Sequence, residues 1–274
     1  MIQWYPGHMV KAFREIDNLI KHVDCILVLL DARIPKSSFN PDIMKRCQNK
    51  KVLFVYTKMD LADDKRLNYF KDYYAQYGES VFINLKQGHA KEQLTKAIIK
   101  TQMEKRQKDA LKGLRPKAIK VMVLGIPNVG KSTLINTLVG KKVASVGNKP
   151  GVTKAEQWIK INDNFELLDT PGVLWPKFED EEVGYNLALT GSIKDDILPI
   201  EEVVAYGVAK LEKLYPGKIQ ERYNVKVEDA STFIDNLIEA KHIYNAKVPD
   251  VHKACMMFLN DLRSGAFGTL CLDE

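Results

Sequence analysis

The clearest chemical pattern in the sequence is the stretch Gly125-Ile-Pro-Asn-Val-Gly-Lys-Ser132. It matches GxxxxGK(S/T), follows an apolar run at 121–124 and precedes a helical pattern, which is the setting of a phosphate-binding loop, or P-loop. Backbone N–H groups of such a loop and the positive end of the helix dipole can bind phosphates. Lys131 is predicted to reach the outer phosphates as a catalytic residue, and Ser132 to ligate Mg²⁺. The nucleotide-binding residues predicted for this loop are Asn128, Val129, Gly130, Lys131, Ser132 and Thr133.

A second motif, Asp169-Thr-Pro-Gly172, ends the apolar run 165–168. Its place fits a DxxG pattern, in which Asp169 would bind Mg²⁺, usually through water, and the Gly172 N–H would contact the γ-phosphate of the nucleotide. Thr153 lies between the two motifs, and a threonine there can complete the Mg²⁺ shell when the γ-phosphate is present. The alternative interpretation is that Thr153 is an ordinary turn residue.

A third motif, Thr57-Lys-Met-Asp60, follows the apolar run 52–56 and looks like the (N/T)KxD motif that reads guanine. Asp60 can accept hydrogen bonds from N1–H and the exocyclic amine of guanine, a donor pair that adenine lacks, so GTP is favoured over ATP. Lys58 would pack its stem over the base, and Thr57 replaces the more usual asparagine. The predicted guanine-binding residues are Thr57, Lys58, Met59 and Asp60, with Leu85 and Lys86, after the apolar run 81–83, as a weaker companion loop.

The elements that must position these motifs alternate between strands and helices. Six short apolar runs read as buried strands, and helical patterns separate most of them. This alternation predicts an α/β fold with a mostly parallel, doubly wound sheet. The strand predictions are 25–30, 52–56, 81–83, 121–124, 158–161 and 165–168, and the helix predictions 9–22, 41–49, 64–77, 131–140 and a long basic stretch at about 90–112.

From about residue 179 the pattern changes, and helices follow one another without strands. Apolar residues at helical spacing predict helices over 200–214, 230–245 and 250–263. We therefore expect two domains, with residues 1–175 containing the sheet and residues 176–274 forming a small all-helical domain.

Composition and charge limit the class of protein. With 45% hydrophobic and 28% charged residues, the chain reads as an ordinary globular protein, and no apolar run approaches a bilayer span. The opening MIQWYPGHM lacks a signal-peptide pattern, and four scattered cysteines without CxxC spacing suit a reducing cytosol. We expect a cytoplasmic protein that does not act at a membrane.

The net charge of +6 conceals an asymmetry, because residues 1–175 carry 30 Lys and Arg against 17 Asp and Glu, and residues 176–274 carry 11 against 18. A basic first part is compatible with a nucleic-acid partner. A solvated lysine-rich surface is the alternative.

The order of the motifs is unusual, because the base-reading motif at 57–60 precedes the P-loop at 125–132. Cutting a closed domain at one surface loop and joining its old termini, here through the basic segment at about 90–120, gives this order without changing the sheet. The chain resembles the circularly permuted GTPases, and within them the ribosome-assembly GTPases of the bacterial ribosome biogenesis GTPase A (YlqF/RbgA) type. The resemblance rests on Gln3–Met9, Asp31–Pro35, Gly125–Ser132 and Leu262–Gly265, and so spans nearly the whole chain.

The resemblance implies a P-loop NTPase fold and a GTPase that acts in late assembly of the large ribosomal subunit. The expected partners are GTP, GDP and the large ribosomal subunit with its RNA, and DNA is not expected. RNA binding by the second domain would require its few basic residues to cluster on one face, namely Lys210, Lys213, Lys218, Arg222, Lys241 and Arg263.

Two residues are candidates for accelerating hydrolysis. A glutamine often follows DxxG and orients the attacking water, but here that residue is Val173, so unaided hydrolysis should be slow unless another group acts. The resemblance places a functional histidine in the opening segment, where His8 could orient water, although His8 could also be a plain turn residue. The resemblance also implies that Asn128 helps to hold a K⁺ ion beside the phosphates, and the alternative is a loop asparagine with an unusual backbone angle.

Three functions remain open at this point. The first is a GTP-hydrolysing switch in ribosome assembly, and the second is a nucleotide-sensing RNA-binding scaffold whose hydrolysis is incidental. An ATP-using P-loop enzyme is disfavoured by Asp60.

Overall fold

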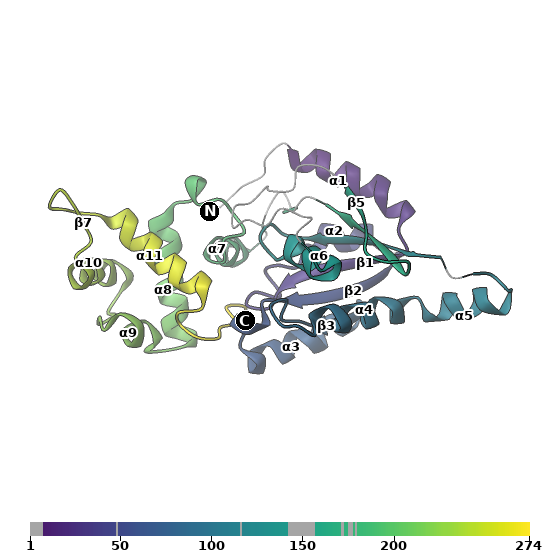
Figure 1. Ribbon diagram of the computed structural model, residues 1–274. Helices are drawn as coiled ribbons and strands as arrows, with labels where there is room; N and C mark the ends of the chain where they lie inside the picture. Colours follow the sequence, from purple (N-terminus) through teal and green to yellow (C-terminus); the bar gives the residue numbers. More distant parts are fainter. Residues whose placement is uncertain are drawn as a thin grey trace.

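The computed structural model describes residues 8–47, 49–115, 117–141, 157–170, 173–174, 178 and 180–274, apart from the side chains of 8–12, 157 and 169. A six-stranded sheet carries helices on both faces, and five helices follow it in the described part of the chain (Figure 1). The strands are β1 (Cys25–Asp31), β2 (Lys51–Thr57), β3 (Glu79–Phe82), β4 (Ile119–Gly125), β5 (Gln157–Lys160) and β6 (Phe165–Asp169).

The strand order is β3-β2-β1-β4-β6-β5, and every neighbouring pair is parallel except β5 with β6. The prediction of a mostly parallel α/β sheet is therefore confirmed. All seven residues of β1 are buried, which is why its sequence is a continuous apolar run and does not alternate.

Alternate residues of β1 face two different layers of helices, because side chains on a strand point to opposite faces in turn. Leu27 and Leu29 pack in the core shared with α4 (Ala90–Thr101) and α6 (Lys131–Val139). Val28 and Leu30 pack in the core shared with α1 (His8–Leu19), α2 (Pro41–Arg46) and α3 (Asp64–Ala75).

The basic stretch predicted as one long helix is two helices, α4 and α5 (Met103–Leu111). They meet at Gln102, which is buried and donates its side-chain amide to the Asp24 carbonyl at 3.1 Å. Because this hydrogen bond joins residues 78 positions apart, the local helical pattern could not reveal that the helix breaks at Gln102. Two short 3₁₀ helices, η1 (Ile20–His22) and η2 (Met59–Leu61), complete this part.

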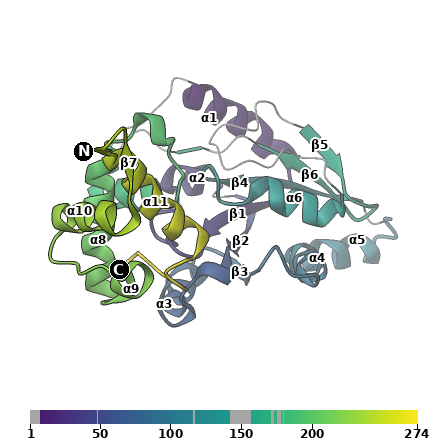
Figure 2. The ribbon, with the colours of Figure 1, turned by 60° about the vertical axis from the view of Figure 1, so that its left-hand side comes forward.

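The C-terminal helices are α7 (Glu181–Leu189), α8 (Ile200–Leu214), α9 (Lys218–Tyr223), α10 (Ala230–Lys241) and α11 (Val251–Ser264), with η3 (Asp195–Ile197) after α7. Figure 2 shows them grouped beside one end of the sheet. Their buried residues, among them Val203 of α8 and Phe258 of α11, belong to the same apolar cluster as Leu27 and Leu29 of the sheet. The two parts therefore share one continuous core.

The helix predicted over 230–245 is too long at its C-terminal end. It ends at Lys241 because His242 has left-handed backbone geometry, and a small hairpin of β7 (Tyr244–Asn245) and β8 (Val248–Pro249) follows. The expectation that no strand occurs in this part is wrong. Ala246 and Lys247 form the turn with positive φ angles of 47° and 69°, and neither residue type signals such a turn.

No helix in the described part of the chain is both long and apolar enough to cross a membrane. All four cysteines are buried free thiols.

Candidate functional site

The four motif regions follow parallel strands and therefore lie at one edge of the sheet. The base-reading motif ends β2, the companion loop at 84–86 follows β3, the P-loop follows β4 and Asp169 ends β6. Because β1, β2, β3, β4 and β6 are mutually parallel, their carboxyl ends meet at the same edge. Ligands of open α/β sheets bind at this edge.

The P-loop passes between β4 and α6 with two residues in left-handed geometry, Asn128 with φ 57° and Gly130 with φ 110°. A side chain at Gly125 would come within 3.0 Å of the Leu29 carbonyl oxygen, so the close approach to β1 requires glycine. Lys131 is buried, and its Nζ donates to the carbonyls of Gly125 at 3.2 Å and of Ile126 at 2.8 Å. The lysine therefore lies across the loop that is expected to hold phosphates.

Thr57 joins the base-reading motif to the P-loop. Its hydroxyl is buried and lies 2.6 Å from the Val129 carbonyl oxygen and 3.2 Å from that of Leu30. A Cβ placed on Gly130 would lie 3.6 Å from a methyl group of Leu85 and 3.8 Å from Thr57. The threonine therefore provides a tie between the loops although asparagine is more usual, and the companion loop at 84–86 lies against the P-loop.

The two charged residues of the base-reading motif are each paired. Asp60, in η2, accepts from Lys86 Nζ at 2.7 Å, which places the companion loop beside the predicted guanine-reading carboxylate. Lys58 has left-handed geometry, with φ 57°, and its ammonium lies 2.8 Å from Asp31 Oδ2. Met59 is half-buried between them.

The Asp31–Arg33 pair is a part of this site to which the sequence assigned no role. Arg33 binds both carboxylate oxygens of Asp31, at 3.0 and 2.8 Å, and both side chains are almost wholly buried. Burial alone would raise the pKa of Asp31, but the charges of Arg33 and Lys58 hold it below its ordinary value. The sequence signal that could have indicated this pair is Asp31-x-Arg33, two opposite charges directly after an apolar strand.

Asn128 and Arg33 each donate a hydrogen bond from this site to the C-terminal helices. Asn128 Nδ2 donates to the Gly191 carbonyl at 2.6 Å, just beyond the end of α7. Arg33 Nη1 donates to the Arg263 carbonyl at 3.4 Å, in the last turn of α11. The first link starts in the P-loop, and the second starts beside the base-reading motif.

Arg263 also fixes the turn that Asn128 contacts. Its guanidinium binds both carboxylate oxygens of Asp195, at 2.7 and 2.8 Å, and donates to the carbonyls of Ala188 at 2.9 Å and Leu189 at 3.1 Å. Gly191 has φ 77°, and a Cβ there would lie 3.3 Å from Arg263 Nε. One side chain therefore holds both the end of α7 and the turn after it.

Asp273 forms a further connection between the sheet and the C-terminal helices, and the sequence did not indicate it. Its buried carboxylate accepts from the backbone N–H groups of Lys36 at 2.6 Å and Ser37 at 2.9 Å, from the Ser37 hydroxyl, and from Asn186 Nδ2 at 3.0 Å. Burial raises the pKa of Asp273, and these hydrogen bonds act in the opposite direction. The segment after β1 is thereby joined to α7.

Of the three predicted Mg²⁺ ligands, the structure describes Ser132 and the backbone of Asp169. Ser132 and Thr133 lie in the first turn of α6, and Asp169 ends β6, its backbone opposite Val123 of β4. Hydroxyl and carboxylate oxygens are the donors that Mg²⁺ prefers. Thr153, Gly172 and the side chains of His8 and Asp169 lie outside the described residues, although His8 begins α1.

The basic residues of the C-terminal helices do not form a free cluster. Lys210 is buried and paired with Glu182 and Glu274, and Lys213 also pairs with Glu274. Arg222 pairs with Asp261 and Arg263 with Asp195. Four of the six cations expected to contact RNA are therefore neutralised by acidic neighbours.

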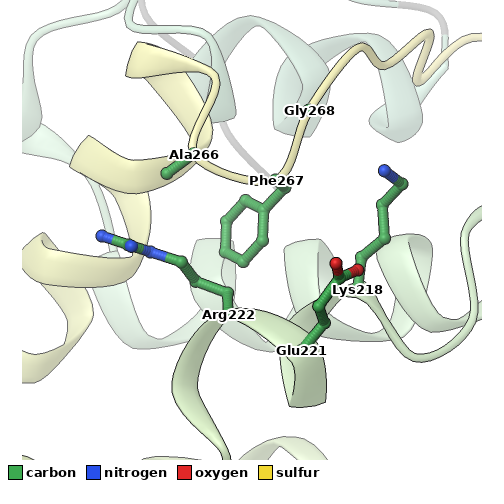
Figure 3. Close-up of a pocket in the computed structure, with 6 residues that line it drawn as sticks. All are labelled: Lys218, Glu221, Arg222, Ala266, Phe267 and Gly268. Carbon is green, nitrogen blue, oxygen red and sulfur yellow. The ribbon is translucent and has the colours of Figure 1, made fainter.

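A surface hollow of about 310 Å³ lies between α9 and the turn after α11. Figure 3 shows the Phe267 ring between the Arg222 and Lys218 side chains. The hollow contains none of the predicted nucleotide-binding residues; it is lined by Lys218, Glu221, Arg222, Ala266, Phe267 and Gly268.

The chain is similar to proteins of a known family. Residues 120–219 match the family model described as 50S ribosome-binding GTPase. Ribosome biogenesis GTPase A of Bacillus cereus is 42% identical to the chain, with 100% of this chain and 94% of that protein covered. The Priestia megaterium protein of the same name is 41% identical, with 100% and 96% covered.

Two solved structures share the fold. The GDP-bound structure of YlqF is 21% identical, covers 94% of this chain and 98% of its own, and has a TM-score of 0.66. The GNP-bound YlqF of T. maritima is 22% identical, covers 96% and 97%, and has the same TM-score of 0.66. Because the chain is more than 40% identical to the two named relatives from Bacillus cereus and Priestia megaterium over nearly their whole length, it belongs to the ribosome biogenesis GTPase A family.

Proposed function

We propose that the protein is a GTP-hydrolysing switch that acts in late assembly of the large ribosomal subunit and binds ribosomal RNA in its GTP state. Family membership, together with the loops gathered at one edge of the sheet, supports GTP as the nucleotide that the protein binds. The family description, 50S ribosome-binding GTPase, supports the ribosomal partner. The protein would act in the cytoplasm, with residues 1–175 as a circularly permuted G domain and residues 176–274 as a helical domain.

The P-loop would bind the phosphates of GTP through its backbone and through Lys131, which already lies across the loop. Ser132, Thr153 and Asp169 are the proposed Mg²⁺ ligands, and the Gly172 N–H would contact the γ-phosphate. When bound, Mg²⁺ would neutralise charge that develops on the phosphate oxygens. Guanine would be selected by Asp60, next to Lys86.

Hydrolysis should be slow without a partner. Val173 is fully buried and its backbone N–H donates to the Gly125 carbonyl at 3.2 Å, so it does not take the water-orienting role of the usual glutamine. We propose His8 for that role, brought close to the attacking water by a conformational change on a ribosomal particle. Asn128 is a proposed K⁺ ligand on the strength of the family resemblance of its loop, and its amide nitrogen donates to the Gly191 carbonyl.

The observation that carries the switch proposal is the pair of links from the nucleotide loops to the C-terminal helices. Asn128 bonds Gly191, and Arg33 bonds the Arg263 carbonyl. Gly172 also lies only nine positions before α7 begins at Glu181. Contacts to a γ-phosphate order the loops around it, and hydrolysis releases them. GTP would thus hold the C-terminal helices in a fixed orientation, and GDP would loosen them.

The test is sedimentation of the protein with purified large subunits across nucleotides and salt concentrations. Tight binding with a non-hydrolysable GTP analogue, weak binding with GDP and a steep salt dependence are expected, because aligned contacts to RNA reinforce one another. Equal binding in both nucleotide states would contradict the switch.

The second candidate is an RNA-binding scaffold that senses nucleotide without needing to hydrolyse it. The buried Val173 in place of glutamine favours this alternative. GTP turnover with and without ribosomal particles separates the two, because a switch requires stimulation and a scaffold does not.

A further inference from the structure

Positive charge is concentrated in one part of the molecule. Residues 90–120 carry ten Lys and Arg against three Asp and Glu, so that their net charge of +7 exceeds the +6 of the whole chain. Residues 103–115, which comprise α5 and the turn after it, are called the basic arm here. Figures 1 and 2 show the basic arm extending beyond the end of the sheet, on the opposite side of the molecule from the C-terminal helices.

Packing does not explain the basic arm. α5 contains no buried residue, and Leu111 is 89% exposed. A nine-residue helix that is exposed on nearly every side is marginal in water by itself. Its attachments to the body are Lys105, which pairs with Asp24 at 2.7 Å, and Arg106, which donates to the Asn164 carbonyl at 3.4 Å.

The outer cations of the basic arm are also unpaired. Lys108, Lys112 and Arg115 are exposed and have no acidic partner within the described ranges. The following Lys117 shares this property. Arg263, by contrast, is neutralised by Asp195 in the C-terminal helices. Exposed cations without an acidic partner in the described ranges are therefore closely spaced on the arm and at Lys117, whereas four of the six cations expected from the sequence to contact RNA are paired with acids.

We propose that the basic arm binds the phosphate backbone of ribosomal RNA and supplies much of the salt-dependent affinity for the large subunit. This inference rests on the RNA binding proposed above and assigns it a surface. Exposed, unpaired cations on a projecting helix complement a polyanion, and each phosphate that they neutralise releases counterions. The exposed Leu111 and Leu114 would be shielded from water against the sugar backbone.

The position of the basic arm separates it from nucleotide chemistry. The arm precedes β4, whereas the P-loop follows the carboxyl end of the same seven-residue strand. A strand of that length spans roughly 20 Å. Substitutions on the arm should therefore leave the GTP site unchanged.

The experiment compares two charge-reversal variants. Lys108→Glu/Lys112→Glu alters the basic arm, and Lys241→Glu/Lys253→Glu applies the same charge change to exposed lysines of α10 and α11. Lys108 and Lys241 both lie in the last turn of their helices, so the change in helix-dipole energy is matched at these two positions. Binding of each protein, with a GTP analogue, is measured to purified large subunits and to protein-free large-subunit RNA over a salt series. GTP turnover without ribosomes checks that both variants are folded.

The arm variant should bind both targets at least tenfold more weakly, and the slope of log affinity against log salt should fall by about two, one for each phosphate that is no longer neutralised. The control should change little. Unchanged slope in the arm variant, or an equal decrease of affinity in the control, overturns the inference. Weak binding to subunits with normal binding to free RNA would also overturn it, because the arm would then contact a ribosomal protein. If the wild type binds neither target, the proposed function itself fails.

Discussion

Replacement of Arg263 by lysine tests whether the C-terminal helices communicate with the nucleotide loops. Arg263 is only 19% exposed and uses four guanidinium N–H groups, two on Asp195 and one each on the carbonyls of Ala188 and Leu189. A lysine ammonium keeps the charge but lacks the planar fork that can reach all of these acceptors. At least two charge-assisted hydrogen bonds should disappear.

The expected magnitude follows from those hydrogen bonds. Each hydrogen bond to a charged group contributes about 1.5–3 kcal/mol, and partial rearrangement of the lysine recovers some of it, so Arg263→Lys should destabilise the protein by roughly 2–4 kcal/mol. Arg222→Lys is the matched control, because Arg222 forms the same bidentate pair with Asp261 but is 42% exposed. Exposed pairs contribute about 0–1 kcal/mol.

The assay combines urea unfolding, followed by circular dichroism, with GTP turnover. If Arg263 positions Gly191 for its bond to Asn128, a decrease of about 1 kcal/mol in the strength of that bond should lower kcat/KM about fivefold. In an Asn128→Ala background the same substitution should have little further effect on turnover, because the two residues act through one hydrogen bond. Normal turnover in a destabilised Arg263→Lys protein, or additive effects in the double variant, would refute the positioning role.

Asp60→Asn should weaken GTP binding by several kcal/mol, since a charged hydrogen-bond acceptor is removed, and favour xanthine nucleotides; unchanged GTP affinity by calorimetry would remove Asp60 from the base site. GTP turnover should be faster in K⁺ than in Na⁺, and Asn128→Ala should abolish that preference while sparing much of the nucleotide binding; equal wild-type rates in the two salts would exclude the potassium site. His8→Ala should lower turnover and leave GTP affinity nearly intact, as for a group that acts in the transition state; an unchanged maximal rate with ribosomal particles would show that His8 is a plain turn residue. Asp31→Asn should destabilise the protein by roughly 3–5 kcal/mol at neutral pH, because Arg33 loses a buried partner. The pKa of Asp31 is lowered on folding, so its stabilising effect is fully present above the ordinary carboxyl pKa of about 4 and is lost as the pH falls from there through the lowered value. The difference in unfolding free energy between wild type and Asp31→Asn should therefore persist down to about pH 4, and its disappearance at higher pH would contradict the pairing.

Much of the fold could be predicted because its signals are local. Each strand of the sheet is a short continuous apolar run, as strands buried on both faces must be, and the predicted bounds agree with the observed strands to within two residues. The P-loop was recognisable because its glycines and lysine occur at fixed spacing between a strand and a helix. The permuted motif order was likewise readable directly from the sequence.

The sequence by itself thus determined the class of the sheet and the residue types available for phosphate and guanine. The tertiary structure decided which partner each charged side chain takes. Asp31 with Lys58, Arg263 with Asp195 and Asp273 with Ser37 are separated by 27, 68 and 236 positions. In an unfolded chain, a lysine or arginine could form an ion pair with any of several acidic residues. Only burial makes one pairing strongly preferred, because a charge removed from water must find a partner within reach. The end of the helix at Gln102 and the hairpin at 244–249 depend in the same way on backbone geometry and long-range hydrogen bonds, which local residue preferences do not specify.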